Sequence, residues 1–393
     1  MTETTTPGLR RPPRATLVTL LGVSTMTIMA SATITPALPG MERHFAAVPH
    51  ADLLVRLVLT VPGLAIMIAA PVLAWLSGRV GRVRVLAAGL LLYVVGGGSG
   101  LVLDWLPGLL AGRVVLGIGI GGIMATSTAL LADHHAEADH GRVLGLQGAA
   151  MGFGGVIALL FGGLLAALSW RGPFAVYLLA VPLLLVVLRF VPEPQPRSSS
   201  TEDNSASTPW TPRVLGMYAL MFLGVVVFYV VPTQAPFLVA EVGGAGPVVT
   251  GVLMALLNLV MTLVGLNFGR VRAHRGFPAL ATAVFVTYAV GLAAVGLAGS
   301  LWVMALGMVV IGVGIGLQNP VLNGWVVATV DPATRTRALG MLTSALFLGQ
   351  FSSPLLAQPV VDSVGLGRVF LLAAGLAVLV AVALAVLRAA RSR

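Results

Sequence analysis

Residues 114–121 read VVLGIGIG, and residues 309–316 read VVIGVGIG. Six of the eight positions are identical, and the other two exchange Leu, Ile or Val across an offset of 195 residues. The same offset pairs further positions along the chain: Arg142 with Arg337, Gly145 with Gly340, Gly154 with Gly349 and Gly81 with Gly276. Because one offset holds across separate regions, we infer two related halves that repeat in parallel.

The composition places both halves in a membrane. Of the 393 residues, 58% are hydrophobic and 9% are charged, and the mean hydropathy is +0.99. A soluble domain carries about 25% charged residues. The chain has no cysteine, which excludes disulfides, thiolate metal sites and a cysteine nucleophile.

Apolar runs long enough to cross a bilayer recur along the sequence. A hydrocarbon core about 30 Å thick needs about 20 apolar residues in a helix. Ala30–Ser31–Ala32 in the first run resembles a signal-peptidase site, but the run is too long for a signal peptide and we expect it to be retained. The sequence therefore predicts an all-α polytopic membrane protein with twelve spans at 15–38, 53–76, 84–103, 108–132, 142–167, 173–191, 213–236, 247–269, 278–298, 301–329, 337–359 and 365–388.

One polar segment divides the twelve runs into six and six. The stretch PEPQPRSSSTEDNSASTPWTPR at 192–213 is rich in Pro, Ser and acidic residues and cannot support a packed core. We predict five parts, of which the second and fourth are six-helix bundles: an N-terminal tail 1–14, a bundle 15–191, a linker 192–212, a bundle 213–388 and a C-terminal tail 389–393.

The arginines indicate the orientation. The chain has 23 basic residues, all of them Arg, and 18 fall on the side of the termini. Arg43, Arg171 and Arg368 fall on the other side, while Arg56 and Arg113 lie within runs. Cytoplasmic loops carry the excess of basic residues, so we expect both termini in the cytoplasm and the protein in the cell membrane. This explains the net charge of +10 without nucleic-acid binding.

Several motifs carry a family resemblance that covers essentially the whole chain. They are AWLSGRVGRVR at 74–84, Arg113 with Gly117, a glycine series at 145–163, and SWRGPF at 169–174. With the internal repeat, they resemble the major facilitator superfamily of secondary transporters, and within it the drug and sugar efflux branch of proton antiporters. The resemblance implies two six-helix halves that rock around a midplane site for a small molecule.

The resemblance also implies gating residues at the turn between the second and third runs. Arg79, Gly81 and Arg82 match the family's loop, but Gly78 stands where the family has an aspartate that latches the outward-open state. We expect a weakened or rebuilt latch; the alternative is that these arginines only anchor the topology. The gating candidates on this side are Gly78, Arg79, Gly81, Arg82, Asp133 and Arg142.

Prolines near the opposite ends of two equivalent runs form a second gating set, because proline disrupts a helix and permits bending. They are Pro36, Pro39, Pro232 and Pro236. The family's antiporter motif is incomplete: Gly145, Gly154, Gly162 and Gly163 match it, but Ala158–Leu159 replaces its central Gly-Pro.

Candidate substrate contacts are an arginine and a set of amides inside runs. Arg113 matches the family's R-x-x-x-G motif, whose arginine is implicated in proton transfer or substrate contact; its alternative role is snorkelling to the interface. The amides are Gln318, Asn319, Asn323, Gln234, Asn258 and Gln350. The cluster at 318–323 is the leading candidate, because the resemblance places the run 301–329 at the cavity. The alternative for the amides is hydrogen bonding between helices.

No acidic residue lies at the middle of a run. Proton coupling then runs through a carboxylate nearer the rim, through some other device, or not at all. The coupling candidates are Asp52, Arg56 and Glu241, with Asp133 as a further acid. Arg56 is interpreted as an exposed pair with Asp52, four residues earlier. The stretch DHHAEADH at 133–140 is interpreted as a solvated turn rather than a metal site.

Together these observations predict a secondary active transporter and not an enzyme. We expect proton-coupled efflux of a neutral or anionic small organic molecule by alternating access. The alternatives are uptake of an organic anion, a receptor-like relative that does not transport, and an intramembrane enzyme, for which acid/base clusters are missing. The expected partners are the substrate, protons and membrane lipids; we expect a monomer without cofactor, metal or nucleic acid.

Overall fold

The structure is a computed structural model that describes residues 14–135, 139–194 and 211–391. Within these residues it has twelve helical segments that are long and apolar enough to cross a membrane, which confirms the all-α architecture and the twelve predicted spans. Several spans extend beyond the predicted apolar runs. The run 53–76, for example, is part of the helix Ala51–Val80. Most of the predicted linker 192–212 lies outside the described residues.

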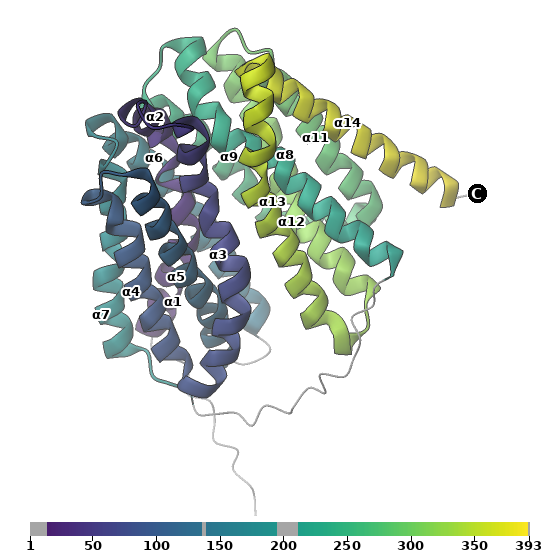
Figure 1. The fold of residues 1–393 in the computed structure, drawn as a ribbon. Helices are drawn as coiled ribbons and strands as arrows, with labels where there is room; N and C mark the ends of the chain where they lie inside the picture. The colour runs from purple at the N-terminus through teal and green to yellow at the C-terminus, as the bar shows by residue number, and fades with distance from the viewer. Residues whose placement is uncertain (1–13, 136–138, 195–210, 392–393) are drawn as a thin grey trace, which may run out of the picture.

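The first six spans form one bundle (Figure 1). Its elements are α1 (Arg14–Ala32), η1 (Thr35–Ala37), α2 (Leu38–His44), α3 (Ala51–Val80), α4 (Arg82–Gly98), η2 (Ser99–Leu101), α5 (Leu106–Asp133), α6 (His140–Leu168), η4 (Gly172–Leu179) and α7 (Ala180–Phe190). Their core includes Leu20, Leu86, Ile120 and Tyr177, all of which are almost fully buried.

The last six spans form a second bundle. Its elements are α8 (Pro212–Gly243), α9 (Pro247–Leu266), α10 (Phe268–His274), α11 (Phe277–Gly296), α12 (Leu301–Thr329), η5 (Pro332–Thr334), α13 (Arg335–Val364) and α14 (Leu366–Arg391). The main core of this bundle includes Tyr288, Ile311 and Phe370, and Leu159 of α6 packs into it from the first bundle. A smaller cluster joins α8, α12 and α13.

The two ends of the molecule differ in how the bundles approach each other. We call the end where α7 finishes and α8 starts the linker end, and the opposite end, which carries α2, the far end. In Figure 1 the ribbons of the two bundles lie close together at the far end and diverge toward the linker end. The contacts between bundles described below run from the far end to the middle of the molecule.

Close backbone packing within each bundle repeats in the two halves. A Cβ at Gly117 of α5 would come 2.6 Å from the carbonyl oxygen of Pro62 in α3. At the equivalent position in the second half, a Cβ at Gly312 of α12 would come 2.7 Å from the carbonyl oxygen of Leu257 in α9. Glycine is therefore needed at both positions, because any side chain would push the helices apart.

The prolines of the two equivalent spans act differently. Pro36 and Pro39 stand in the first turns of η1 and α2, so the first span is broken after Ala32 and continues to His44. Pro232 and Pro236 lie inside α8, which remains one continuous helix. Proline is tolerated at the start of a helical segment because its missing N–H would have no partner there. The break therefore separates α2 from α1 only in the first half.

Candidate functional site

A central cavity of about 370 Å³ lies between the two bundles. Most of its lining is apolar, from residues such as Ile66, Met124, Phe228 and Phe347. Its polar lining residues are Thr27, Ser31, Thr35, Tyr229, Asn258, Asn319 and Gln350. Among the described residues, no arginine, histidine or acidic residue lines this cavity. A pocket of this size with an apolar wall and a few neutral polar groups suits a small organic molecule.

Three predicted amides lie in the cavity wall. Asn258 of α9 donates from Nδ2 to the carbonyl oxygen of Gly152 in α6 at 3.1 Å, across the bundle interface. Gln350 of α13 packs against Gly63 of α3, where a Cβ would come 3.1 Å from the amide carbon. Asn319 of α12 has a buried Oδ1 without a hydrogen-bond partner among the described residues. The cavity therefore offers amide groups from three helices of the second bundle.

The other predicted amides lie elsewhere. Gln318 points into the second bundle, where its Oε1 accepts a hydrogen bond from Tyr288 Oη at 2.6 Å and its Nε2 donates to Met221 Sδ at 3.4 Å. Asn323 is exposed and donates to the backbone oxygen of Asn319 at 2.8 Å. Neither residue lines the cavity, contrary to the prediction. Gln318 points about 100° away from Asn319 around the helix, whereas Asn323 lies one turn further along the same face, at an exposed position outside the cavity lining.

Arg113 is also absent from the cavity wall. Its side chain is 1% exposed, and Nη1 donates to Tyr177 Oη at 2.9 Å. The guanidinium carbon lies 4.7 Å from the ring centroid of Phe174 and 5.0 Å from that of Tyr177. The Nε and Nη2 atoms have no partner among the described residues. Arg113 therefore neither snorkels to an interface nor reaches the cavity; two aromatic rings hold it inside the first bundle.

Arg56 forms the centre of a polar network at the far end. Its Nη1 donates to Glu42 Oε2 at 2.6 Å and to the backbone oxygen of Asp52 at 2.7 Å. Its Nε donates to Gln234 Oε1 of α8 at 2.8 Å, and its guanidinium carbon lies 4.0 Å from the ring centroid of Phe237. Arg56 thus joins α2 and α3 of the first bundle to α8 of the second.

The network continues to α13. Gln358 Nε2 donates to Asp52 Oδ2 at 2.7 Å and to Asp362 Oδ1 at 2.8 Å. Gln358 Oε1 lies 3.5 Å from Gln234 Nε2, at the limit of a hydrogen bond. We call the five residues of this network the far-end lock: Glu42, Asp52, Arg56, Gln234 and Gln358. Two of its contacts cross between the bundles, Arg56 with Gln234 and Gln358 with Asp52.

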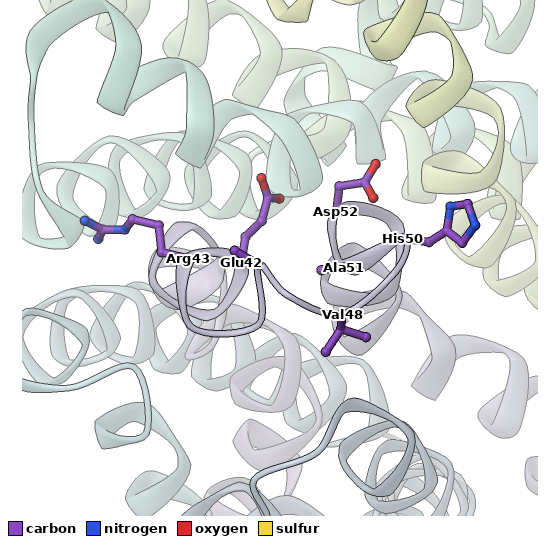
Figure 2. A pocket seen from close by; sticks show the side chains of 7 residues that line it. Glu42, Arg43, Val48, His50, Ala51 and Asp52 are labelled. Carbon is purple, nitrogen blue, oxygen red and sulfur yellow. The ribbon is translucent and has the colours of Figure 1, made fainter.

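A second cavity of about 400 Å³ lies beside this lock. Figure 2 shows its lining: Glu42 from α2 and Asp52 from the start of α3 point the same way, while Arg43 and His50 point outward on opposite sides. The two carboxylates therefore stand together at the far end.

The interpretation of Arg56 and Asp52 as an exposed pair is wrong. The Arg56 side chain is 3% exposed, and its carboxylate partner is Glu42. The Asp52 carboxylate turns instead toward Gln358 of the other bundle. The predicted pairing rested on the helical spacing of four residues, but Arg56 pairs with Glu42 of α2 and Asp52 binds Gln358 of the other bundle instead.

At the linker end, two carboxylates hold the turn that carries Arg82. Arg82 pairs with Asp133 at the end of α5. Glu193, which follows α7, accepts hydrogen bonds from the backbone N–H of Arg82 at 2.5 Å and of Val83 at 3.0 Å. Gly81 has φ +111, and a Cβ there would come 3.0 Å from the Glu193 carboxyl group. The first bundle therefore supplies acids to this turn although Gly78 carries none.

The remaining candidates make fewer contacts. Gly78 has open space around it, and Arg79 stacks 3.7 Å above the Trp75 ring. Arg142 and Glu241 are exposed. In the stretch 133–140, of which 136–138 lie outside the described residues, ring nitrogens of His134, His135 and His140 contact backbone oxygens at 2.8 to 3.1 Å. Roles for these residues remain predictions.

Sequence reasoning missed four residues of these networks: Glu42, Gln358, Asp362 and Glu193. Glu42 lies beyond the predicted end of the first span, and only the continuation through α2 brings it beside Arg56. Gln358 and Asp362 share a helix face at a spacing of four residues. This spacing is the one local feature of the sequence from which a contact in the network could have been predicted.

Solved structures of transporters share the whole fold. The chain superposes with a TM-score of 0.82 on a nucleoside transporter, at 14% identity, covering 94% of this chain and 99% of that one. A bacterial homolog of the human lysosomal transporter Spinster gives 0.80 at 16% identity, covering 94% and 95%. The human organic anion transporter MFSD10 gives 0.69 at 18% identity, covering 96% and 100%.

Two curated relatives match over parts of the chain. The tetracycline resistance protein, class C, of Escherichia coli is 35% identical over 161 residues, which cover 40% of each protein. The arabinose-proton symporter of E. coli is 31% identical over 119 residues, which cover 30% of this chain and 25% of the symporter. The matches thus span less than half of either relative.

A family model covers a larger part of the chain. The model of the Major Facilitator Superfamily matches residues 20–287, which reach from the first span into the ninth. With the twelve spans and the shared fold, this match confirms the resemblance drawn from the motifs. The chain belongs to the Major Facilitator Superfamily.

Proposed function

We propose that the protein exports an uncharged, largely apolar small organic molecule across the cell membrane by alternating access. The observation that carries this proposal is the central cavity between the bundles, whose polar lining consists of hydroxyls and amides. An ion transferred into such a cavity would lose its hydration without meeting an opposite charge, at an effective cost of several kcal/mol. A neutral molecule avoids that cost.

This proposal narrows the substrate expected from the sequence. The sequence predicts a neutral or anionic substrate, and the anionic choice depends on an arginine at the cavity; Arg113, however, is held by Phe174 and Tyr177 inside the first bundle. The amides of Asn258, Asn319 and Gln350 suit a molecule with hydrogen-bonding groups such as amides, hydroxyls or ketones. Apolar surface then supplies affinity, and the amides supply orientation.

Alternating access requires that each end of the cavity opens in turn. The far-end lock supports a state in which the far end is closed, because Arg56 and Gln358 reach across the bundle interface there. We propose that breaking these contacts opens the far end while the linker end closes. In that state the turn at residues 77–84, with Arg82 and Asp133, approaches the second bundle.

The orientation of this cycle follows from the arginine distribution. With 18 of the 23 arginines on the side of the termini, we propose that the linker end faces the cytoplasm and the far end faces outward. The protein would then reside in the cytoplasmic membrane.

The direction of transport is proposed from similarity. The relative with the higher identity is a tetracycline resistance protein, which favours export.

A proton is the proposed coupling ion, with Glu42 and Asp52 as its sites. They face Arg56 on α3, Gln234 on α8, and Gln358 and Asp362 on α13. In the outward-open state these carboxylates would meet external protons.

Uptake is the second candidate function. The partial match to an arabinose-proton symporter favours an uncharged solute that enters together with protons. The uncharged cavity suits this alternative equally well. Export and uptake are distinguished only by whether the substrate moves opposite to the protons or together with them.

Transport by the purified protein in proteoliposomes tests the proposal. The probes are tetracycline, an uncharged lipophilic fluorophore, and anionic and cationic derivatives of that fluorophore, each with an imposed pH gradient of either sign. We expect the uncharged probe to move against its gradient, in the direction opposite to protons. Transport of only the anionic probe would contradict the assignment of substrate charge, and movement with protons would favour uptake.

A further inference from the structure

The internal repeat makes the two seams between the bundles directly comparable. One seam joins α3 to α13, and the other joins α6 to α9. At the offset of 195 residues, Asp52 corresponds to Pro247 and Gly163 to Gln358, so the contact of Asp52 with Gln358 corresponds to that of Pro247 with Gly163. Equivalent positions of the two seams occupy the same place in their halves, so a difference between them is a difference in side-chain chemistry.

The α3–α13 seam is polar at the far end. Gln358 binds the Asp52 carboxylate at 2.7 Å, and beside it Arg56 binds Glu42 and Gln234. The Glu42 side chain is 33% exposed, so water already reaches this network. Charged and amide groups exchange protein partners for water at small net cost, because water offers them equivalent hydrogen bonds.

The α6–α9 seam has no such groups at the equivalent positions. A Cβ at Gly163 would come 2.8 Å from the carbonyl oxygen of Pro247, and a Cβ at Gly251 would come 2.6 Å from that of Leu159. The two helices therefore meet backbone to backbone. Separating them would sacrifice close packing without exposing side chains that water could satisfy.

The same difference continues to the middle of the molecule. Gly63 corresponds to Asn258 and Gly155 to Gln350 at the offset of 195 residues, and each pair of helices seats one amide against one glycine. A Cβ at Gly155 would come 2.4 Å from Asn258 Nδ2, whereas a Cβ at Gly63 would come 3.1 Å from Gln350. The α6–α9 seam is thus the tighter one at this depth also.

We propose that the far end opens on one side only: the α3–α13 seam separates, while the α6–α9 seam stays closed and acts as the hinge. This inference rests on the proposed alternating access. The substrate then leaves the central cavity between α3 and α13. It passes a polar exit whose walls carry Glu42, Asp52 and Asp362, so the route has an acidic lining although the cavity has none.

Spin-label distances across the two seams test the proposal, and the cysteine-free chain permits labelling without background changes. One labelled pair replaces exposed Ala47 and Ser363 beside the α3–α13 seam. The other replaces exposed Leu168 and Val248 beside the α6–α9 seam. Each pair is measured in three backgrounds: the otherwise unchanged chain, the Arg56→Gln variant, and the Gly251→Ala variant.

We expect Arg56→Gln to add a population with a longer distance for the pair 47/363 and to leave the pair 168/248 unchanged. Gly251→Ala perturbs the opposite seam. It is expected to lower thermal stability and to shift the pair 168/248 locally, because the added Cβ must displace α6 or α9, without adding a longer population for the pair 47/363.

A symmetric opening would lengthen both pairs whichever seam is perturbed, and that result would overturn the proposal. A longer 168/248 distance in Arg56→Gln, a longer 47/363 distance in Gly251→Ala, or no change of either pair in Arg56→Gln would overturn it as well. The distances do not depend on a transported compound. One-sided opening without any measurable transport would therefore count against the proposed function and not against the hinge.

Discussion

Arg113 donates a hydrogen bond to Tyr177 Oη at 2.9 Å, and Tyr177 Oη in turn donates to the backbone oxygen of Ala30 at 2.5 Å. The guanidinium thereby connects α5 and η4 to the last turn of α1, where the first span breaks. Nε and Nη2 of Arg113 have no partner among the described residues. A buried guanidinium held mainly by aromatic rings costs folding free energy, so its presence points to a role in the transport cycle.

Arg113→Met is expected to abolish transport while changing the apparent melting temperature little. Methionine fills similar volume and removes a buried charge, and such replacements are often neutral or stabilising. Transport in proteoliposomes and thermal unfolding in detergent measure the two effects. Tyr177→Phe is the matched variant: losing the bridging hydroxyl should cost about 1–3 kcal/mol and lower the melting temperature. Full transport by Arg113→Met would show that the arginine is dispensable.

The far-end lock predicts a shift in accessibility. Glu42→Gln weakens the contact with Arg56, so the far end should open more often. A cysteine introduced at Ser31, in the cavity wall, should then react faster with an impermeant thiol reagent added from the far-end side. Arg43→Gln is the control, because among the described residues the Arg43 side chain hydrogen-bonds only to the nearby backbone oxygen of Pro39. Equal reaction rates in the two variants would contradict a locking role for Glu42.

The turn at the linker end predicts opposite effects for two neighbouring glycines. Gly81→Ala should destabilise the protein by about 1–3 kcal/mol, because alanine is strained at φ +111 and crowds Glu193. Gly78→Ala has open space inside a helix and should stabilise by up to about 1 kcal/mol. Apparent melting temperatures of both variants provide the test. A similar decrease in melting temperature in both variants would mean that the stability of the turn does not depend on the Gly81 conformation.

The uncharged cavity predicts a change in substrate selectivity. Gln350→Glu places a carboxylate in the cavity wall, so transport of the uncharged fluorophore should fall at least about tenfold, equivalent to about 1.4 kcal/mol. Transport of the cationic derivative should rise at the same time. Asn323→Asp adds the same charge at an exposed position of α12 outside the cavity. It should change the transport of neither the uncharged nor the cationic fluorophore. Unchanged selectivity in Gln350→Glu would place the substrate away from Gln350.

The helical architecture was predictable because apolar length alone specifies a membrane span. The ends of the spans were less predictable: Arg79 extends α3 by stacking on Trp75, a contact that a count of apolar residues does not contain. Likewise Pro39 appeared to finish the first span but instead starts α2, which carries the lock residue Glu42.

The candidate site was predictable only in part. Asn258, Asn319 and Gln350 line the cavity as expected, but Gln318 beside Asn319 faces Tyr288 within its own bundle. A single sequence identifies polar residues within spans without specifying which neighbour each one meets. The Arg56–Glu42 contact depends on the path of α2, and a local spacing rule pointed to Asp52 instead.

The break in the first span also has a kinetic consequence. Glu42 lies on α2, a segment of 7 residues that α1 does not extend into as one continuous helix. Partly exposed side chains such as that of Glu42 change rotamer within picoseconds to nanoseconds, whereas whole bundles reorient over microseconds to milliseconds. Rotamer changes of Glu42 alone would release its contact with Arg56 many times for each complete transport cycle. The carboxylate would then equilibrate with the outer solution long before the cavity itself opens.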